Sequence, residues 1–312
     1  MSRDEFSFDP SKYVPFRDTK ELKRVRAISR GEIDKHSNPN FHIQVVGDDL
    51  LEHIFVTDMF YRIWRAREED RKAVLLLPNP NFGYIKLAHL INTFQLPCDH
   101  LHTFNLDEYA DQDGNVAPES FPQGFLRATK NYLFKKIDPS LRPPEEQIVG
   151  FTNENLLDYG NMITDLGGAD ASYTGPGWTG HLGFIEPDAP EFEGDLETWK
   201  RMGPRIVTLS PLTIAQNSLH GSFGACGDLA LVPPKAATIG PAQIIESKYR
   251  MDMHGLSVGG TVISWQRFVT RLCLHGPVTP LVPTSILQEV GADVFVAESA
   301  ARDIEPIWDL AY

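Results

Sequence analysis

The sequence lacks several features that would assign it to a common class of protein. It has only three cysteines in 312 residues, Cys98, Cys226 and Cys273, which are too few and too scattered for a disulfide framework or a zinc cluster. No stretch approaches the roughly 20 apolar residues of a membrane-spanning helix. The first residues mix charges and prolines without the apolar core of a signal peptide. We therefore expect a cytoplasmic protein with reduced thiols and no membrane partner.

Positively charged residues are also few. Lysine and arginine number 29 against 42 aspartates and glutamates, which gives a formal net charge of -13. Proteins that bind nucleic acid need a basic surface for the phosphates, so this composition argues against a nucleic-acid partner. The remaining composition, 42% hydrophobic and 23% charged, is typical of a globular protein with an ample core.

Apolar runs of strand length alternate with segments of helical spacing. We expect strands at 42–46, 73–77, 101–105, 171–175, 228–232 and 293–297, and helices from 48 onward, at 87–94, at 125–134 and at 263–274. This alternation predicts an α/β fold with a doubly wound, mostly parallel, Rossmann-like sheet flanked by helices. The polar residues 1–40 are expected to form an N-terminal arm, and residues 41–312 a single α/β domain.

Two polar, glycine-containing segments follow predicted strands. The first is FNLDEYAD at Phe104–Asp111, and the second is GPGWTGHLGFIEP at Gly175–Pro187. Open α/β sheets bind ligands outside the carboxyl ends of their strands, so we expect the chemistry here. Asp107 and Glu108 are adjacent, and on an extended chain only one of them would face a substrate.

These segments resemble the two signatures of the glucosamine-6-phosphate deaminase family, whose superfamily also contains the 6-phosphogluconolactonases. The matching positions are Phe104, Asn105, Asp107, Glu108, Tyr109, Gly175, Gly177, Gly180, His181, Phe184, Glu186 and Pro187. Thr179 stands where the family has aspartate, and Ile185 where it has asparagine. The resemblance implies a homo-oligomeric aldose–ketose isomerase or deaminase that needs no cofactor. Its partner would be a small-molecule sugar, amino sugar or sugar phosphate.

The resemblance also implies roles for three residues. Asp107 would be the base that moves a proton between C2 and C1, and His181 with Glu186 would open the sugar ring. The spacing of His181 and Glu186 allows the carboxylate to accept a hydrogen bond from one ring nitrogen, which leaves the other for proton exchange. Thr179 can orient an imidazole by a hydrogen bond but cannot stabilise its cation by charge.

The usual phosphate pocket of the family is altered in this chain. Two prolines interrupt the segment Pro78–Gly83, where the family has a Thr-Gly-Gly-Thr-type loop, and Leu219 replaces an arginine. Two alternatives stay open. Asn79 and Asn81 would bind the hydroxyls of an unphosphorylated sugar, or Gly259, Gly260 and Thr261 would form a substitute anion site with Lys248 or Arg250. Further expected substrate contacts are Glu108, Gly177, Trp178, Thr179 and Gly180.

Other readings of the sequence remain beside this one. A sugar lactonase would use the same Gly-His turn to activate water, and a non-catalytic regulator would bind a sugar without turning it over. Trp178 would either stack on a sugar ring or pack in the core. His100 and His102 have no obvious third ligand, so no metal site is predicted, and the glycine pattern at Gly175–Gly180 fits a dinucleotide only loosely.

Overall fold

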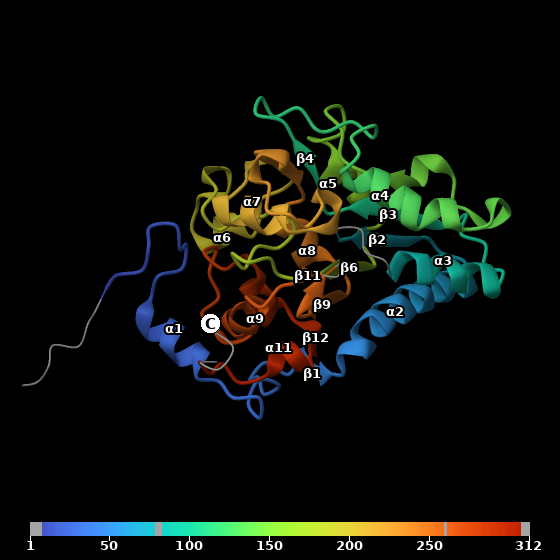
Figure 1. The fold of residues 1–312 in the computed structure, drawn as a ribbon. Helices are drawn as coiled ribbons and strands as arrows, with labels where there is room; N and C mark the ends of the chain where they lie inside the picture. The colour runs from blue at the N-terminus through green and yellow to red at the C-terminus, as the bar shows by residue number, and fades with distance from the viewer. Residues whose placement is uncertain (1–7, 79–82, 259–260, 307–312) are drawn as a thin grey trace, which may run out of the picture.

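The structure, a computed structural model, describes residues 8–78, 83–258 and 261–306. In these residues a seven-stranded sheet has the order β1-β12-β9-β6-β2-β3-β5, and every neighbouring pair is parallel (Figure 1). The strands are β1 (Phe41–Val46), β2 (Ala73–Leu77), β3 (Leu101–Asn105), β5 (Ile148–Val149), β6 (Ala171–Thr174), β9 (Arg250–His254) and β12 (Ala292–Ala297).

Smaller sheets accompany the main one in the described ranges. Strand β8 (Lys235–Thr238) pairs antiparallel with β4 (Asp107–Ala110) on one side and β7 (Arg205–Thr208) on the other. Strands β10 (Ser257–Val258) and β11 (Thr261–Val262) form an antiparallel pair. Since β4 begins only two residues after β3 ends, the chain passes directly from the main sheet into the three-stranded one.

Helices cover both faces of the main sheet. The α-helices are α1 (Thr19–Arg26), α2 (Asp48–Glu68), α3 (Gly83–Thr93), α4 (Phe125–Tyr132), α5 (Tyr159–Asp165), α6 (Leu196–Trp199), α7 (Pro211–Ser218), α8 (Pro241–Glu246), α9 (Gln266–His275), α10 (Leu287–Val290) and α11 (Glu298–Ala301). Figure 1 shows α2 and α3 side by side on one side of the sheet, and α11 beside β12 and against α9.

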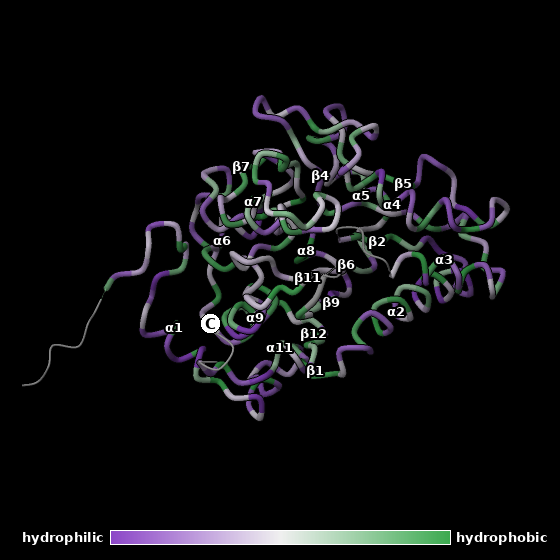
Figure 2. The backbone as a smooth tube through the Cα atoms, in the orientation of Figure 1, coloured by the Kyte–Doolittle hydropathy of each residue, from purple (hydrophilic) through white to green (hydrophobic). Residues whose placement is uncertain are grey.

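Strand β2 shows how the sequence produces this layering. All five of its residues are buried, as expected for a parallel strand covered on both faces. Ala73, Leu75 and Leu77 join the core that includes α2 and α3, whereas Val74 and Leu76 join the core on the opposite face. Helix α2 carries both hydrophobic and hydrophilic residues along its length (Figure 2), and its buried residues are Phe55, Val56, Met59, Ile63 and Ala66.

The order of the strands defines a switch point between β2 and β6. From β2 the sheet continues through β3 to β5, and from β6 it continues in the other direction through β9 and β12 to β1. Ligands of open α/β sheets bind at such a point, outside the carboxyl ends of the strands. Gly175 follows β6, so the segment that carries His181 leaves the sheet at this edge, and Pro78, the last described residue before 83, follows β2.

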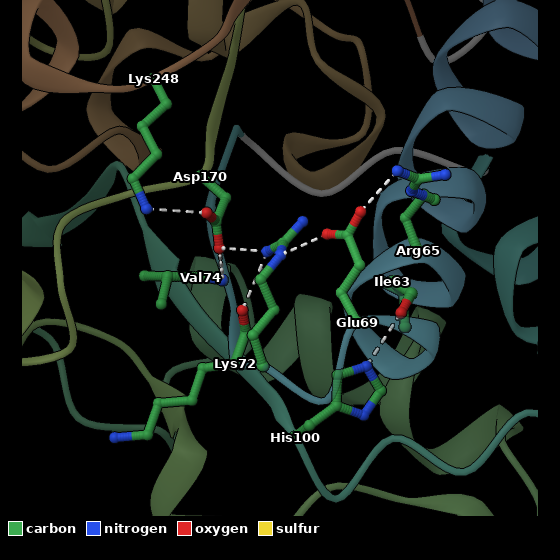
Figure 3. A network of polar contacts seen from close by, with 9 residues as sticks. Ile63, Arg65, Glu69, Lys72, Val74, His100, Asp170 and Lys248 are labelled. Atoms are coloured by element: carbon green, nitrogen blue, oxygen red, sulfur yellow. Dashed lines mark hydrogen bonds and ion pairs between the residues drawn. The ribbon is translucent and has the colours of Figure 1, made fainter.

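The opposite, amino-terminal edge carries a network of ion pairs (Figure 3). Asp170 accepts a hydrogen bond from the Val74 backbone N–H at 2.8 Å and pairs with Lys248 at 3.0 Å and with Arg71 at 3.3 Å. Arg71 also pairs with Glu69 at 2.8 Å. This network joins the starts of β2, β6 and β9, on the side of the sheet away from the switch point.

The α/β prediction is confirmed, and one expected strand needs correction. Residues 228–232 do not form a strand, because Asp228 accepts a hydrogen bond from the Ala230 N–H and caps a 3-10 turn at Leu229–Leu231. The strand of this region is β8 instead. The N-terminal arm contains helix α1, which packs against α9. The division into an arm and one domain stays a prediction. In the described ranges, no helix is long and apolar enough to cross a membrane.

Candidate active site

Asp107 opens strand β4 and pairs through its backbone register with Thr238 of β8. Its side chain is buried, with 3% exposed, and its carboxylate has no hydrogen-bond partner among the described residues. Burial raises the pKa of Asp107 well above its ordinary value of 3.8, and the neighbouring charge of Glu108 raises this pKa further. A buried carboxyl group without a partner is costly for the fold, which is typical of a functional position.

Glu108 points away from Asp107, as the alternation of an extended chain requires. Its carboxylate accepts hydrogen bonds from the backbone N–H groups of Tyr109 at 2.9 Å, Phe125 at 3.0 Å and Leu126 at 2.9 Å. The last two lie in the first turn of α4, where a negative charge is favourable. This geometry favours a structural role for Glu108, and its contact with a substrate remains a prediction.

His181 is held by two side chains through one ring nitrogen. Its Nδ1 lies 3.1 Å from Thr213 Oγ1 in α7 and 3.4 Å from Glu186 Oε2. The imidazole is 5% exposed and Glu186 is 1% exposed. Sequence reasoning expected the contact with Glu186 but missed the one with Thr213, since nothing in the local pattern of α7 marks that residue.

Thr179 contacts the glutamate rather than the imidazole. Its hydroxyl donates to Glu186 Oε2 at 3.1 Å, the same oxygen that faces His181 Nδ1. The other oxygen, Oε1, is buried and has no partner in the described residues. The expectation that Thr179 orients the imidazole directly is therefore corrected, because the threonine acts on the carboxylate that in turn faces the ring.

Glycines allow the turn before His181 to form. A Cβ atom on Gly177 would overlap Nε2 of His181, so no side chain fits there. Gly180 has φ +78°, a left-handed conformation that favours glycine, and its N–H donates to the Gly177 carbonyl at 2.9 Å. Thr284 donates its N–H to the Gly180 carbonyl and its hydroxyl to the His181 carbonyl, each at 3.0 Å. The backbone around the imidazole is thus fixed from both sides.

Trp178 lies at the surface and not in the core. Its side chain is 38% exposed and stacks on Trp265, with ring centroids 6.1 Å apart and an angle of 9° between the rings. Its backbone N–H donates to Gln216 Oε1 of α7 at 2.7 Å. The two indoles form a partly exposed aromatic surface beside the turn that carries His181.

The two halves of the site meet at Gly183 and Phe184. A Cβ atom on Gly183 would lie 3.6 Å from Asp107 Oδ2, so the backbone here borders the carboxylate. The Phe184 ring is 6.0 Å from the His181 ring and 5.8 Å from the Tyr109 ring. Asp107 and His181, 74 positions apart in the sequence, therefore border the same short stretch of chain.

A second histidine that sequence reasoning missed lies near His181. His220 follows the end of α7, and burial together with the nearby His181 lowers the pKa of His220 to about 4. Its imidazole is therefore neutral at neutral pH and can accept or donate a hydrogen bond.

Several predicted residues lie outside the description or away from the site. Asn79, Asn81, Gly259 and Gly260 are outside the described residues, and Thr261 is described only as part of β11. Lys248 and Arg250 lie at the amino-terminal edge, and Arg250 Nη1 donates to the Ile245 carbonyl at 3.0 Å. The suggested anion site at 259–261 stays a prediction. Across the described ranges, no group of three His, Cys, Asp or Glu residues could hold a metal ion.

The topology and the two segments define an α/β protein of the kind found in deaminases and lactonases of phosphosugars. Among solved structures, a monomeric glucosamine-6-phosphate deaminase has a TM-score of 0.65 at 22% identity, over 83% of this chain and 98% of that one. The 6-phosphogluconolactonase of Thermotoga maritima has a TM-score of 0.57 at 16% identity, over 82% and 99%. At these identities the comparison shows a shared fold.

Sequence comparison identifies the family. The chain is 31% identical over 229 residues to the glucosamine-6-phosphate deaminase of Rhodopirellula baltica, which covers 72% of this chain and 80% of the relative. It is 33% identical over 204 residues to glucosamine-6-phosphate deaminase 2 of Bacillus subtilis, over 64% and 71%. No model of a protein family matches the sequence. The chain belongs to the glucosamine-6-phosphate deaminase family.

Proposed function

We propose that this protein is an aldose–ketose isomerase or deaminase that acts on a sugar or amino sugar without a cofactor. The observation that carries the proposal is the placement of an unpaired carboxylate, Asp107, and a supported imidazole, His181, on either side of Gly183–Phe184. Moving a proton between C2 and C1 requires one base, and opening the ring requires a group that gives a proton to the ring oxygen. The site contains one candidate for each task.

Asp107 is the proposed base. Its raised pKa makes the ionised carboxylate a stronger base than an exposed aspartate, because proton affinity rises with pKa. It takes the proton from C2 and delivers it to C1, so the carboxyl group returns to its starting state. Among the described residues, no lysine or arginine shifts the pKa of Asp107, so no cation among them offsets this basicity.

His181 is the proposed ring-opening residue. Thr213 and Glu186 both face Nδ1, which leaves Nε2, on the side of Gly177, to exchange a proton with the ring oxygen. Trp178 offers an aromatic face on which the apolar side of a sugar can lie. We also propose that the protein is cytoplasmic and that it self-associates. Analytical sedimentation would measure its state of association.

The proposal covers substrates with either a hydroxyl or a phosphate at the 6-position of the sugar. The named relatives act on glucosamine 6-phosphate, as their names state, and this chain has Leu219 and a proline-containing loop where the family binds phosphate. Within the described residues, no lysine or arginine forms a hydrogen bond or an ion pair with His181 or Glu186. Both an unphosphorylated sugar and a sugar phosphate fit these observations.

A substrate screen in heavy water tests the proposal. Glucose and glucosamine, each free and as the 6-phosphate, are incubated with the protein, and exchange of the C2 proton and release of ammonia are followed by NMR. Exchange with one sugar supports the proposal and identifies its phosphorylation state. Hydrolysis of a sugar lactone with no C2 exchange would instead indicate the lactonase, and binding without either reaction would indicate the regulator.

A further inference from the structure

A second pair of ionisable side chains lies beside the site, at the carboxyl end of β9. Asp252 and His254 are both fully buried, and Asp252 Oδ2 lies 2.7 Å from His254 Nε2. Burying such a pair carries a desolvation cost that two apolar side chains would avoid. A polar pair at this position is therefore poorly explained by stability alone, and its hydrogen bonds show what else it does.

One end of the pair holds the start of residues 174–181, which we call the histidine segment. Asp252 Oδ1 accepts a hydrogen bond from Thr174 Oγ1 at 2.7 Å. Thr174 is the last residue of β6, and Gly175 after it packs against β9 so closely that a Cβ atom would lie 2.7 Å from the Met253 carbonyl oxygen. The aspartate thus fixes the point at which the segment leaves the sheet.

The other end of the pair reaches the same segment through α9. His254 Nδ1 lies 3.0 Å from Thr270 Oγ1, and the Thr270 hydroxyl is 3.5 Å from Gln266 Oε1. Gln266 Nε2 donates to the Pro176 carbonyl at 2.7 Å. All three side chains are buried, at 0% for His254 and Thr270 and 3% for Gln266. The network therefore attaches to the segment at two points, two residues apart.

We propose that Asp252 and His254 are positioning residues for His181. Gly177, next to Pro176, lies against Nε2 of His181 with no room for a single extra carbon atom, so a shift of this backbone moves the imidazole. The network keeps Pro176 and Gly177 in place and so aims Nε2. The effect on turnover rests on the proposed function, whereas the effect on the backbone does not.

The test breaks the network at its middle without removing the buried pair. Thr270→Val keeps the shape of the side chain and removes the hydroxyl between His254 and Gln266. Thr103→Val is the matched control, because Thr103 is also buried, at 2%, and its hydroxyl has no partner in the described residues. The measurements are kcat and KM, the melting temperature, and amide hydrogen exchange of peptides covering 175–181.

We expect Thr270→Val to lower kcat by about tenfold or more while KM stays within about twofold, since misplacement of a catalytic group affects the chemical step. Amide exchange in 175–181 should be faster than in the wild type, and Thr103→Val should change neither quantity. If the two variants behave alike, the network is only structural and the proposal is overturned.

A second variant and a second readout keep the proposal testable if the first experiment fails. If Thr270→Val does not fold, Gln266→Met removes the bond to Pro176 while keeping the bulk of the side chain, with the same expected results. If the wild type turns over no sugar, the exchange of 175–181 decides alone. Unchanged exchange would then refute the positioning role, separately from the failure of the proposed function.

Discussion

Replacing Asp107 with asparagine should make the protein more stable while it removes the proposed base. The carboxyl group is 3% exposed, has no hydrogen-bond partner among the described residues, and has a pKa raised by burial and by Glu108. An ionised group in such a place opposes folding, and asparagine has the same shape without the charge. The fold therefore gives up stability to keep an acid at this position.

The size of the effect follows from the burial. Each pKa unit corresponds to about 1.4 kcal/mol, and a buried polar group without a partner costs about 1–3 kcal/mol, or more when charged. We expect Asp107→Asn to raise the free energy of unfolding by about 1–3 kcal/mol at pH 8. At about 2–4 °C per kcal/mol for domains of 150–250 residues, the melting temperature should rise by several degrees.

The difference in stability between the wild type and Asp107→Asn should depend on pH in a definite direction. Because the pKa of Asp107 is higher in the folded state, the unfolded chain loses its proton first as the pH rises from 3.8. Wild-type stability should therefore fall, relative to Asp107→Asn, between pH 3.8 and the raised pKa, and the difference should stay constant above it. Near pH 4 the two proteins should be almost equally stable.

Urea unfolding at several pH values measures this difference. Asp111→Asn is the control, because hydrogen bonds from Asn115 lower the pKa of Asp111, and that variant should lose its deficit in stability as the pH falls. A wild type that is the more stable protein at pH 8, or a difference that does not change with pH, would refute the reasoning about Asp107.

Three other substitutions test the site. Gly177→Ala should lower kcat by about a hundredfold because the methyl group displaces the His181 ring, whereas Gly31→Ala, which meets nothing within 4 Å, should be neutral in the same assay. Glu108→Ala should lower the free energy of unfolding in urea by about 1–3 kcal/mol, because three backbone N–H groups lose their acceptor. An unchanged unfolding midpoint would contradict the structural role of Glu108. Thr179→Asp should lower the melting temperature without raising kcat, because it places a second carboxylate beside Glu186. A gain in kcat would contradict this and show that threonine at this position limits the activity.

The secondary structure could be predicted from the sequence where the local pattern of residues agrees with their burial. Residues 73–77 form the strand that their continuous apolar run predicts, and the alternation of Asp107 and Glu108 is seen in the structure. The prediction failed at 228–232, where a capped turn takes the place of a strand. Strand β8 was not predicted because it has no long apolar run and three of its four residues, Lys235–Ala237, are of types depleted in strands.

Side chains that act through tertiary contacts were harder to predict. Thr213 reaches His181 only because α7 packs against the turn, and no local spacing indicates that contact. Asp252 and His254 stand in a strand that alternates polar and apolar residues, which suggests one solvated face, yet both are fully buried. Their partners, on β6 and α9, are brought to them by the fold.

The central claim is that Asp107 moves the C2 proton of a bound sugar. The most direct measurement is C2 proton exchange in heavy water for the wild type and Asp107→Asn, with binding of the same sugar measured by calorimetry. The account predicts that Asp107→Asn binds the sugar with similar affinity and exchanges its C2 proton at least about a hundredfold more slowly, the usual scale for a general base. Exchange near the wild-type rate in Asp107→Asn would contradict it.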